Sequence, residues 1–290
     1  MTVRDPQFYA AWKDEAHAVH FDGLRYIPTP LLVRRWEGFN EVRLLGELLR
    51  REPTLTVLEI GCATGEMFRY VSRRHPRATY IGTDISEPAI NRAKEKFGAR
   101  GRFILTDPSL ATLDDLKPDI VFCRDVLQHQ TEPWTFLRRL YGLAGKALVM
   151  RIRTRDKGAT EYNAELSCQY HAGSWVPFIM VNVDELVETL STSFTPPPSR
   201  IALVKDYIVL GGHHGRFVPK DCYDVATGTA ETAMLVEKSR GDGRAPNVEI
   251  SARADGEQTP GWLRMQLASR LSSKLVRGFV GRRYAGRTWW

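Results

Sequence analysis

Along the middle of the chain, short runs of apolar residues alternate with stretches that have helical periodicity. The short runs predict strands, because parallel strands buried on both faces are almost continuously apolar. They cover residues 56–60, 79–84, 102–107, 119–123 and 146–152. The helical patterns lie between them at 66–74, 87–97 and 133–143. This alternation predicts an α/β fold with a doubly wound, Rossmann-like and mostly parallel sheet.

The pattern continues with a helix at 183–190 and two late strands at 201–211 and 232–238. The late strands bring the expected sheet to seven strands. We therefore expect an N-terminal helical lid at 1–52, the α/β domain at 53–240, and a linker with a basic helical tail at 241–290.

Small and acidic residues follow the first three predicted strands, where a doubly wound sheet collects its ligands. A dinucleotide-binding turn needs glycine at its first, third and sixth places, and this chain has Gly61, Ala63 and Glu66 there. The Glu66 carboxylate would compete with a pyrophosphate for the positive end of the helix. The sequence therefore disfavours a dinucleotide.

A ligand with a carboxylate, an ammonium and a sulfonium fits these residues better. Backbone N–H groups of the turn can bind its carboxylate, and Glu59 places negative charge where a cation would bind. Asp84 ends the second strand, where it can accept both hydroxyls of a ribose. Asp107 ends the third strand, where it can accept from an adenine amino group.

The segments LEIGCATG, GTD and ILTD, in this order at successive strand ends, resemble the class I S-adenosylmethionine (SAM)-dependent methyltransferases. The resemblance covers about residues 55–237 and implies an enzyme whose cofactor is S-adenosyl-L-methionine. Ala63 replaces the middle glycine of the family's usual turn, which would be strained at a positive φ. The cofactor-binding residues that it implies are Glu59, Gly61, Ala63, Gly65, Asp84, Ile85, Asp107 and Arg124.

The loop after the fourth strand, residues 123–133, is expected to face the cofactor. It contains Asp125 and His129, which are four residues apart and would share one face of a helical turn. We interpret His129 as a general base for an acceptor hydroxyl and Asp125 as its catalytic partner. The alternative is that His129 packs beneath the cofactor while Asp125 caps the following turn.

The predicted substrate-binding residues are Arg151, Arg153, Tyr162 and His171. Strand alternation sends the two arginines to one face, where they could bind a phosphate, a uronate or an acidic sugar. The two rings could stack on the ring of an acceptor. The alternatives are solvated arginines and aromatic residues that hold an insertion down. No metal site is predicted, because no carboxylate accompanies a histidine pair at a suitable spacing.

The net charge of +7 is concentrated near the C-terminus. Residues 258–290 hold seven basic residues and no acid, which leaves 34 basic and 34 acidic residues in 1–257. Large apolar residues recur there every four positions, at Leu263, Leu267, Leu271, Leu275 and Phe279. This pattern favours a membrane-surface helix that binds anionic lipid. Docking on the body and a solvated tail are the alternatives.

The sequence has no signal peptide and no apolar run long enough to span a membrane, so we expect a cytoplasmic protein, peripheral at the inner membrane surface. The four cysteines form no CxxC pair and predict neither a zinc site nor a disulfide framework.

The first functional hypothesis is O-methylation of a sugar, a glycan or another small polar acceptor, lipid-linked at the membrane surface. The second is a nucleic acid methyltransferase that binds its substrate through the basic tail. The neutral charge of the body argues against nucleic acid as a partner. The third is a non-catalytic module that only binds SAM. The sequence leaves the oligomeric state open.

Overall fold

The computed structural model describes residues 6–210, 215–223, 227–239 and 245–252. The predicted tail, residues 258–290, lies outside the described residues. One compact unit comprises Met1–Ser251.

The N-terminal part of the chain is helical. It consists of α1 (Pro6–Lys13), α2 (Glu15–Asp22), α3 (Thr29–Glu37) and α4 (Asn40–Arg51). Asp14 caps α2, because its carboxylate accepts from the backbone N–H of Ala16 at 2.7 Å. Pro30 stands in the first turn of α3, where its missing N–H costs no helical hydrogen bond.

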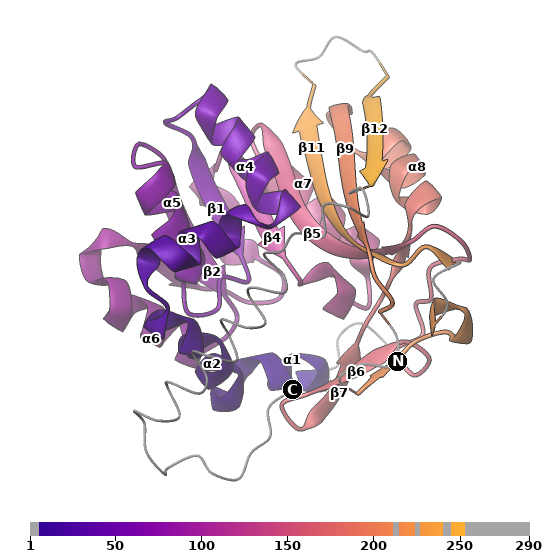
Figure 1. The fold of residues 1–290 in the computed structure, drawn as a ribbon, viewed down its shortest axis with the longest axis horizontal. Helices are drawn as coiled ribbons and strands as arrows, with labels where there is room; N and C mark the ends of the chain where they lie inside the picture. Colours follow the sequence, from indigo (N-terminus) through magenta and orange to yellow (C-terminus); the bar gives the residue numbers. More distant parts are fainter. Residues whose placement is uncertain (1–5, 211–214, 224–226, 240–244, 253–290) are drawn as a thin grey trace. The chain divides into compact units, whose positions relative to one another are not determined.

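The central sheet has the strand order β12-β9-β11-β5-β4-β1-β2-β3 (Figure 1). Strands β1 to β5 pair in parallel, while β11 is antiparallel to both β5 and β9. The strands are β1 (Thr56–Ile60), β2 (Thr79–Asp84), β3 (Arg102–Leu105), β4 (Ile120–Arg124), β5 (Ala147–Arg155), β9 (Pro198–Tyr207), β11 (Ala230–Lys238) and β12 (Asn247–Ala252).

The α/β fold with a mostly parallel sheet is confirmed, but the expected count of seven strands is wrong. The short strand β8 (Val181–Asn182) pairs with β5, and β12 adds an edge, so the sheet has nine strands. Neither carried a strong signal, because β8 is two residues long and every side chain of β12 is exposed. The segment assigned to the linker thus contains a strand.

Helices cover both faces of the sheet. They are α5 (Glu66–Arg74), α6 (Glu87–Phe97), α7 (Pro133–Leu143) and α8 (Val183–Ser193), and the short 3₁₀ helices are Gly23–Tyr26, Gly98–Arg100, Ala111–Leu116, Leu127–His129 and Lys220–Tyr223. Val57 packs in one core layer and Leu58 in the other, because successive side chains of a strand point to opposite faces. Both layers are buried, which fixes the strand ends between them.

A small antiparallel sheet lies apart from the central one. It contains β6 (Cys168–His171), β7 (Ser174–Pro177) and β10 (Arg216–Phe217). Figure 1 shows β6 and β7 at the same end of the molecule as α1 and α2, and α1 contacts β7. This end faces the carboxyl ends of the parallel strands.

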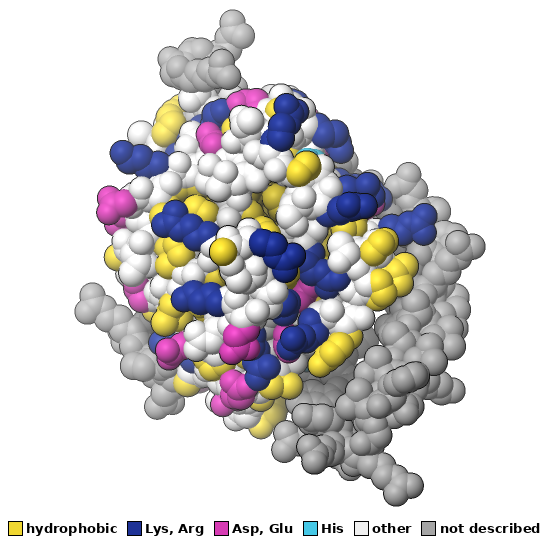
Figure 2. All heavy atoms as spheres, turned by 90° about the vertical axis from the view of Figure 1, so that its left-hand side faces the viewer, with side chains coloured by type: hydrophobic (Ala, Val, Ile, Leu, Met, Phe, Trp, Pro, Cys, Tyr) yellow, Lys and Arg dark blue, Asp and Glu magenta, His cyan; other side chains and the backbone are white. Residues whose placement is uncertain are grey.

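The surface charge is mixed on the face that Figure 2 draws. Lys and Arg side chains lie there among acidic and apolar ones. Within the described residues, no helix is long and apolar enough to cross a membrane.

Candidate active site

A pocket opens where β1, β2 and β4 end, at the point where the strand order reverses between β1 and β4. It encloses about 1160 Å³ of space, counting its open mouth. Tyr9 and Trp12 of α1 and His17 and Phe21 of α2 line it opposite the strand ends.

The turn after β1 forms one wall of the pocket. The backbone N–H groups of Gly61 and Cys62 both donate to the carbonyl of Thr83, at 2.8 and 2.9 Å, so the turn is tied to β2. Gly61 has a φ of +78°, and a Cβ there would approach Val126 to 2.6 Å. Ala63 has a φ of +46°, so alanine occupies the left-handed conformation that favours glycine.

Gly65 serves the fold instead of the pocket. It also has a φ of +78°, and a Cβ at this position would meet the Phe103 ring at 2.6 Å. Gly65 precedes α5 and lies outside the pocket wall. The structure thus gives this predicted cofactor residue a packing role.

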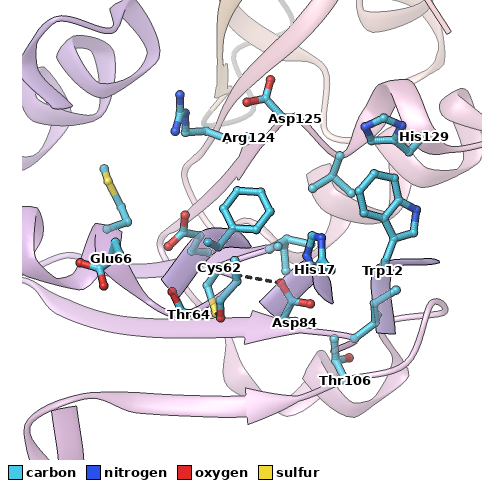
Figure 3. Close-up of a pocket in the computed structure, with 18 of the residues that line it drawn as sticks. Trp12, His17, Cys62, Thr64, Glu66, Asp84, Thr106, Arg124, Asp125 and His129 are labelled. Atoms are coloured by element: carbon cyan, nitrogen blue, oxygen red, sulfur yellow. Dashed lines mark hydrogen bonds between the residues drawn. The ribbon is translucent and has the colours of Figure 1, made fainter. Parts of the chain in front are cut away.

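Asp84 is buried on the floor of the pocket (Figure 3). Its two carboxylate oxygens accept from the backbone N–H groups of Ser86, at 2.9 Å, and Ala63, at 2.8 Å. Burial raises the pKa of Asp84, and the backbone hydrogen bonds oppose this shift. The carboxylate is therefore fixed in place while its other lone pairs can accept hydrogen bonds from a ligand. Ile85 lines the pocket beside it.

Asp107 is not brought into the pocket, which corrects the expected placement. Its carboxylate accepts from the backbone N–H of Ser109 at 2.7 Å and from the Ser109 hydroxyl. The neighbouring residues Thr106 and Pro108 line the wall instead. The strand ends at Leu105, two residues before the predicted end, and Thr106 lines the pocket in place of Asp107.

Glu59 lies deep in the pocket on β1. The Tyr80 hydroxyl donates to Glu59 Oε2. Burial is the main cause that raises the pKa of Glu59 to about 7, against the hydrogen bond from Tyr80 and the charge of Arg124. A bound cation would favour the ionised form of this carboxyl.

Arg124 lines the pocket at the end of β4. Its Nε donates to Glu41 Oε1 of α4 at 2.6 Å, and its guanidinium lies 4.7 Å from the Trp36 ring and 4.6 Å from the Phe39 ring. Burial, followed by the charge of Arg151, lowers the pKa of Arg124. Helices α3 and α4 therefore hold this cation against the pocket.

Asp125 also lines the pocket, in a strained conformation with a φ of +56°. Arg151 Nε donates to its Oδ1 at 2.9 Å, and Arg153 Nη1 lies 2.9 Å from the same oxygen. Burial alone would raise the pKa of Asp125, but the charges of Arg151, Arg153 and Arg124 outweigh it and hold the pKa well below its usual range. The carboxylate is ionised and paired.

His129 ends a 3₁₀ helix, and its ring contacts the Trp12 ring at a tilt of 45°, with 4.4 Å between ring centroids. Its Nδ1–H donates to the Pro177 carbonyl at 2.7 Å, and Gln128 Nε2 lies 3.4 Å from Nε2. Burial is the main cause that lowers the pKa of His129 to about 3. The imidazole is neutral, with Nε2 as the acceptor nitrogen.

The predicted hydrogen-bonded pair of Asp125 and His129 does not form. Asp125 faces the arginines of β5, whereas His129 faces β7. The helical turn that would align them is replaced by the left-handed residue Asp125 and a single 3₁₀ turn. The general-base role of His129 stays a prediction, and its low pKa makes it a weak base.

The four predicted substrate residues lie outside the pocket wall. Arg151 and Arg153 share one face of β5, as alternation predicts, but both also pair with Glu231, at 3.4 and 3.0 Å. Tyr162 accepts from Trp134 Nε1 at 2.6 Å. The His171 ring stacks on the Trp12 ring, with the ring centroids 4.4 Å apart, and His171 Nε2 is 3.0 Å from His17 Nδ1.

Sequence reasoning missed the residues of α1 and α2 that close the pocket. Trp12 touches His17, His129 and His171, so it joins the N-terminal helices to β6 and to the loop after β4. The signal in the sequence was the aromatic residues of segment 6–22, and these do not indicate which other segment they pack against. Among the described residues, no group of three potential ligands is placed to hold a metal ion.

Comparisons with known proteins find similarity to methyltransferases. A family model described as a methyltransferase domain matches residues 58–146. A trans-aconitate 2-methyltransferase of Variovorax paradoxus is 30% identical over 130 residues, which cover 44% of this chain and 49% of the relative. Another from Methylobacterium radiotolerans is 28% identical over 153 residues, covering 52% and 58%. The chain spans about half the length of these curated relatives.

Solved structures of methyltransferases are also similar to this chain. A crystal structure of the plantazolicin methyltransferase BpumL, with a pentazolic desmethylPZN analogue and S-adenosylhomocysteine (SAH), has a similar fold, with a TM-score of 0.50 at 19% identity, over 80% of this chain and 95% of that one. Magnesium protoporphyrin IX methyltransferase from Synechocystis with bound SAM has a TM-score of 0.48 at 18% identity, over 82% and 100%.

Proposed function

We propose that the protein transfers a methyl group from SAM to an oxygen of a small polar acceptor in the pocket, because a family model described as a methyltransferase domain matches residues 58–146. The single observation that carries this proposal is the arrangement of the pocket. The turn after β1, Glu59 and Asp84 form one wall, and Trp12 and His129 stand on another.

The cofactor would lie along the strand ends. Asp84 would accept the ribose hydroxyls, and the turn from Gly61 to Ala63 would let the backbone approach the methionine part. Ile85 and Thr106 would border the adenine, with Asp107 supporting the loop from outside. Glu59 would face the positive charge of the ligand.

When bound, SAM supplies an electrophilic methyl group on a sulfonium. The residues of this chain would align an acceptor oxygen with it and keep water away. Trp12 and Phe21 would cover the side of the pocket opposite the strand ends. Arg124 and Asp125 would set the orientation of the acceptor, since they lie on the side away from Asp84 (Figure 3).

Two classes of acceptor fit this proposal. The sequence favours a hydroxyl of a sugar or glycan, lipid-linked at a membrane surface that residues 258–290 would bind. Such a hydroxyl needs a base, and His129 is the candidate. The similarity to the trans-aconitate methyltransferases favours a carboxylate, which is already ionised at neutral pH. The pKa of His129, about 3, supports the second class, because a weak base removes a proton from an alcohol poorly.

Calorimetric titration with SAH tests the cofactor part. We expect Asp84→Ala to weaken SAH binding by about hundredfold, because two ligand hydrogen bonds to a charged group are lost. Asp107→Ala is the matched control, since this second strand-end acid lies outside the pocket, and it should change SAH affinity less than about threefold. Circular dichroism checks that both variants fold.

Transfer of a labelled methyl group from SAM tests the reaction. Trans-aconitate serves as the carboxylate acceptor and glucose as the hydroxyl acceptor. A wild-type protein that binds no SAH, or that binds it equally well in the Asp84→Ala variant, would overturn the assignment of the pocket.

A further inference from the structure

The first two helices of the chain are held in place differently from the next two. Helices α3 and α4 contribute large core residues, among them Leu32, Trp36 and Leu45. Among the described residues, α1 and α2 contribute none to the three clusters of buried apolar side chains. A segment with few buried apolar contacts opens at a lower free energy than the core does. We call α1 and α2, residues 6–22, the arm.

The arm forms the wall of the pocket opposite the strand ends. Trp12, His17 and Phe21 belong to this wall, and Figure 3 shows Trp12 and His17 on the pocket. A ligand bound along the strand ends would therefore lie beneath the arm. The arm thus covers the ligand site without being part of the core.

One end of the arm is held by rings. The His171 ring of β6 stacks on Trp12, with 22° between the ring planes, and His171 Nε2 lies 3.0 Å from His17 Nδ1. Trp12 and His17 line the pocket, whereas His171 lies outside its wall. His171 therefore fixes two pocket side chains of the arm without facing the ligand itself.

The other end of the arm is held by charges. Asp22 ends α2, and Lys96 Nζ lies 3.1 Å from its Oδ1. The same Nζ donates to Glu66 Oε1 in the pocket wall and, at 3.1 Å, to the Thr64 carbonyl. The side chains of Lys96 and Glu66 are only 11% and 4% exposed. Separating charges that are nearly buried leaves them uncompensated, so this end resists opening.

The chain that follows the arm is fixed to the same acid. Arg69 pairs with Glu66 at 2.9 Å. It also donates to the Ile27 carbonyl at 2.6 Å and to the Thr29 hydroxyl at 2.8 Å. Residues 22–29 are thus bound to the pocket wall through Glu66 and its two cations. A movement of the arm would turn about these residues and would first break the ring contacts at the other end.

We propose that the arm opens to exchange the cofactor, that residues 22–29 are its pivot, and that His171 is the latch that keeps it closed. This inference rests on the proposed function, because SAM and SAH are the ligands that would pass. His171 is a positioning residue in this scheme, since it acts on the ligand through Trp12 and His17. The opening of such covering segments sets the rate of product release in many enzymes.

A latch has a kinetic signature of its own. Weakening it raises the open fraction by the same factor in the free and in the ligand-bound protein. Association and dissociation then both accelerate, and the Kd stays nearly constant. The loss of a direct contact with the ligand accelerates dissociation and leaves association unchanged.

Stopped-flow measurement of SAH binding to the full-length protein tests the latch. We expect His171→Ala to raise the association and dissociation rate constants by about tenfold each, while the Kd changes less than about threefold. His171→Phe keeps a ring against Trp12 but loses the hydrogen bond to His17, so both rate constants should rise by only about threefold.

Tyr170→Ala is the matched control for the latch. Tyr170 is the neighbouring residue on β6, but its side chain is 51% exposed and contacts Trp175 instead of the arm. Because successive side chains of a strand point to opposite faces, its loss should leave the contacts of His171 intact. Both rate constants should stay within about twofold of the wild type.

A variant at the pivot should behave differently. Lys96→Gln removes the charge that holds Asp22, and it also loosens Glu66 and the Thr64 carbonyl in the pocket wall. We therefore expect the SAH affinity of this variant to fall by about tenfold. The latch variant changes rates at constant affinity, whereas the pivot variant changes affinity.

Hydrogen exchange of the protein without ligand tests the opening itself. We expect the backbone amides of α1 and α2 to exchange at least about fivefold faster in His171→Ala than in the wild type. The amides of α4 should exchange at the wild-type rate, because α4 is packed in the core.

The outcomes separate this inference from the proposed function. If SAH does not bind the wild-type protein, the proposed function fails, and unchanged exchange of the arm in His171→Ala would exclude the latch independently. If SAH binds but His171→Ala keeps both wild-type rates, or Tyr170→Ala accelerates them equally, the latch is overturned. Faster dissociation with unchanged association would also overturn it, because His171 would then support a ligand contact and not the closed arm.

Discussion

The two sides of the pocket are built in different ways. The cofactor side consists of the turn after β1 and the ends of β1 and β2, and its main contact is the hydrogen bond from the Ala63 backbone to Asp84. The acceptor side combines α1, α2, the end of β4 and β7, and it is held together by side chains such as Trp12 and Arg151. One side is held by hydrogen bonds from the backbone of a turn to the neighbouring strand, and the other is held by contacts between side chains.

This difference has a physical consequence for how each side tolerates change. A turn that is fixed by neighbouring parallel strands keeps its shape when a side chain elsewhere is altered. Charged groups that hold one another in a partly buried cluster lose their balance when a single member is removed. We therefore expect the largest effects on stability at the acceptor side.

The largest expected effect is that of Asp125→Ala. The substitution leaves Arg151 and Arg153 without their shared acid, and it places alanine at a φ of +56°. We expect the free energy of unfolding to fall by about 3 kcal/mol in chemical denaturation. Asp114→Ala, which breaks an exposed ion pair with Arg139, should cost about 0.5 kcal/mol at most.

The pH dependence of this stability has a definite sign. The pKa of Asp125 is lowered in the folded protein, so its contribution is present above the unfolded value near 3.8 and is lost as the pH falls. Wild-type stability should therefore decrease more steeply below pH 4 than that of Asp125→Ala. Equal slopes for the two proteins would contradict the pairing of Asp125 in the native state.

The next effect concerns the contacts of Trp12. Its ring joins α1 to His129 and His171, so Trp12→Ala should open the acceptor side and leave the strand ends unchanged. We expect methyl transfer to fall by about thirtyfold while SAH affinity changes less than threefold. A SAH affinity that falls as far as the transfer rate would show that Trp12 belongs to the cofactor side.

Trp175→Ala is the matched control for this experiment. Trp175 packs on Tyr170 and Phe217 in the small sheet and is 47% exposed, away from the pocket wall. Its loss should leave methyl transfer within about twofold of the wild type. A large decrease in methyl transfer by this variant would mean that the whole small sheet, and not Trp12 alone, contributes to the acceptor side.

The same division explains what the sequence could predict. The helices α5, α6 and α7 begin and end where their periodicity indicates, and Asp84 stands where a strand-end acid is expected. Each of these depends on residues close together in the sequence. The third strand ends at Leu105 instead of Asp107, and Thr106 lines the pocket there, because the apolar pattern alone does not determine where a strand ends or which side chain turns inward.

The acceptor side could not be predicted in this way. Spacing suggested that Asp125 and His129 share a helical turn, but the pairing of Asp125 with the arginines of β5 and of His129 with Pro177 separates them. These contacts join segments that are 26 and 48 residues apart. Periodicity carries no information about such tertiary pairings, and the same applies to Trp12.

The smallest of the three effects belongs to the cofactor side and concerns Glu59. Its pKa is raised to about 7 in the folded protein, so in the absence of ligand its contribution to stability is full below about pH 4.5 and is lost as the pH rises through 7. A bound cation favours the ionised carboxyl, so SAM binding should release a proton near neutral pH. We therefore expect SAM affinity to increase by about tenfold between pH 6 and pH 8.

Glu59→Gln keeps an acceptor for the Tyr80 hydroxyl but cannot ionise, so its SAM affinity should be nearly constant over that range. Calorimetry in two buffers of different ionisation enthalpy measures both the affinity and the released proton. If the wild type and Glu59→Gln show the same pH profile, the carboxyl does not interact with the positive charge of SAM.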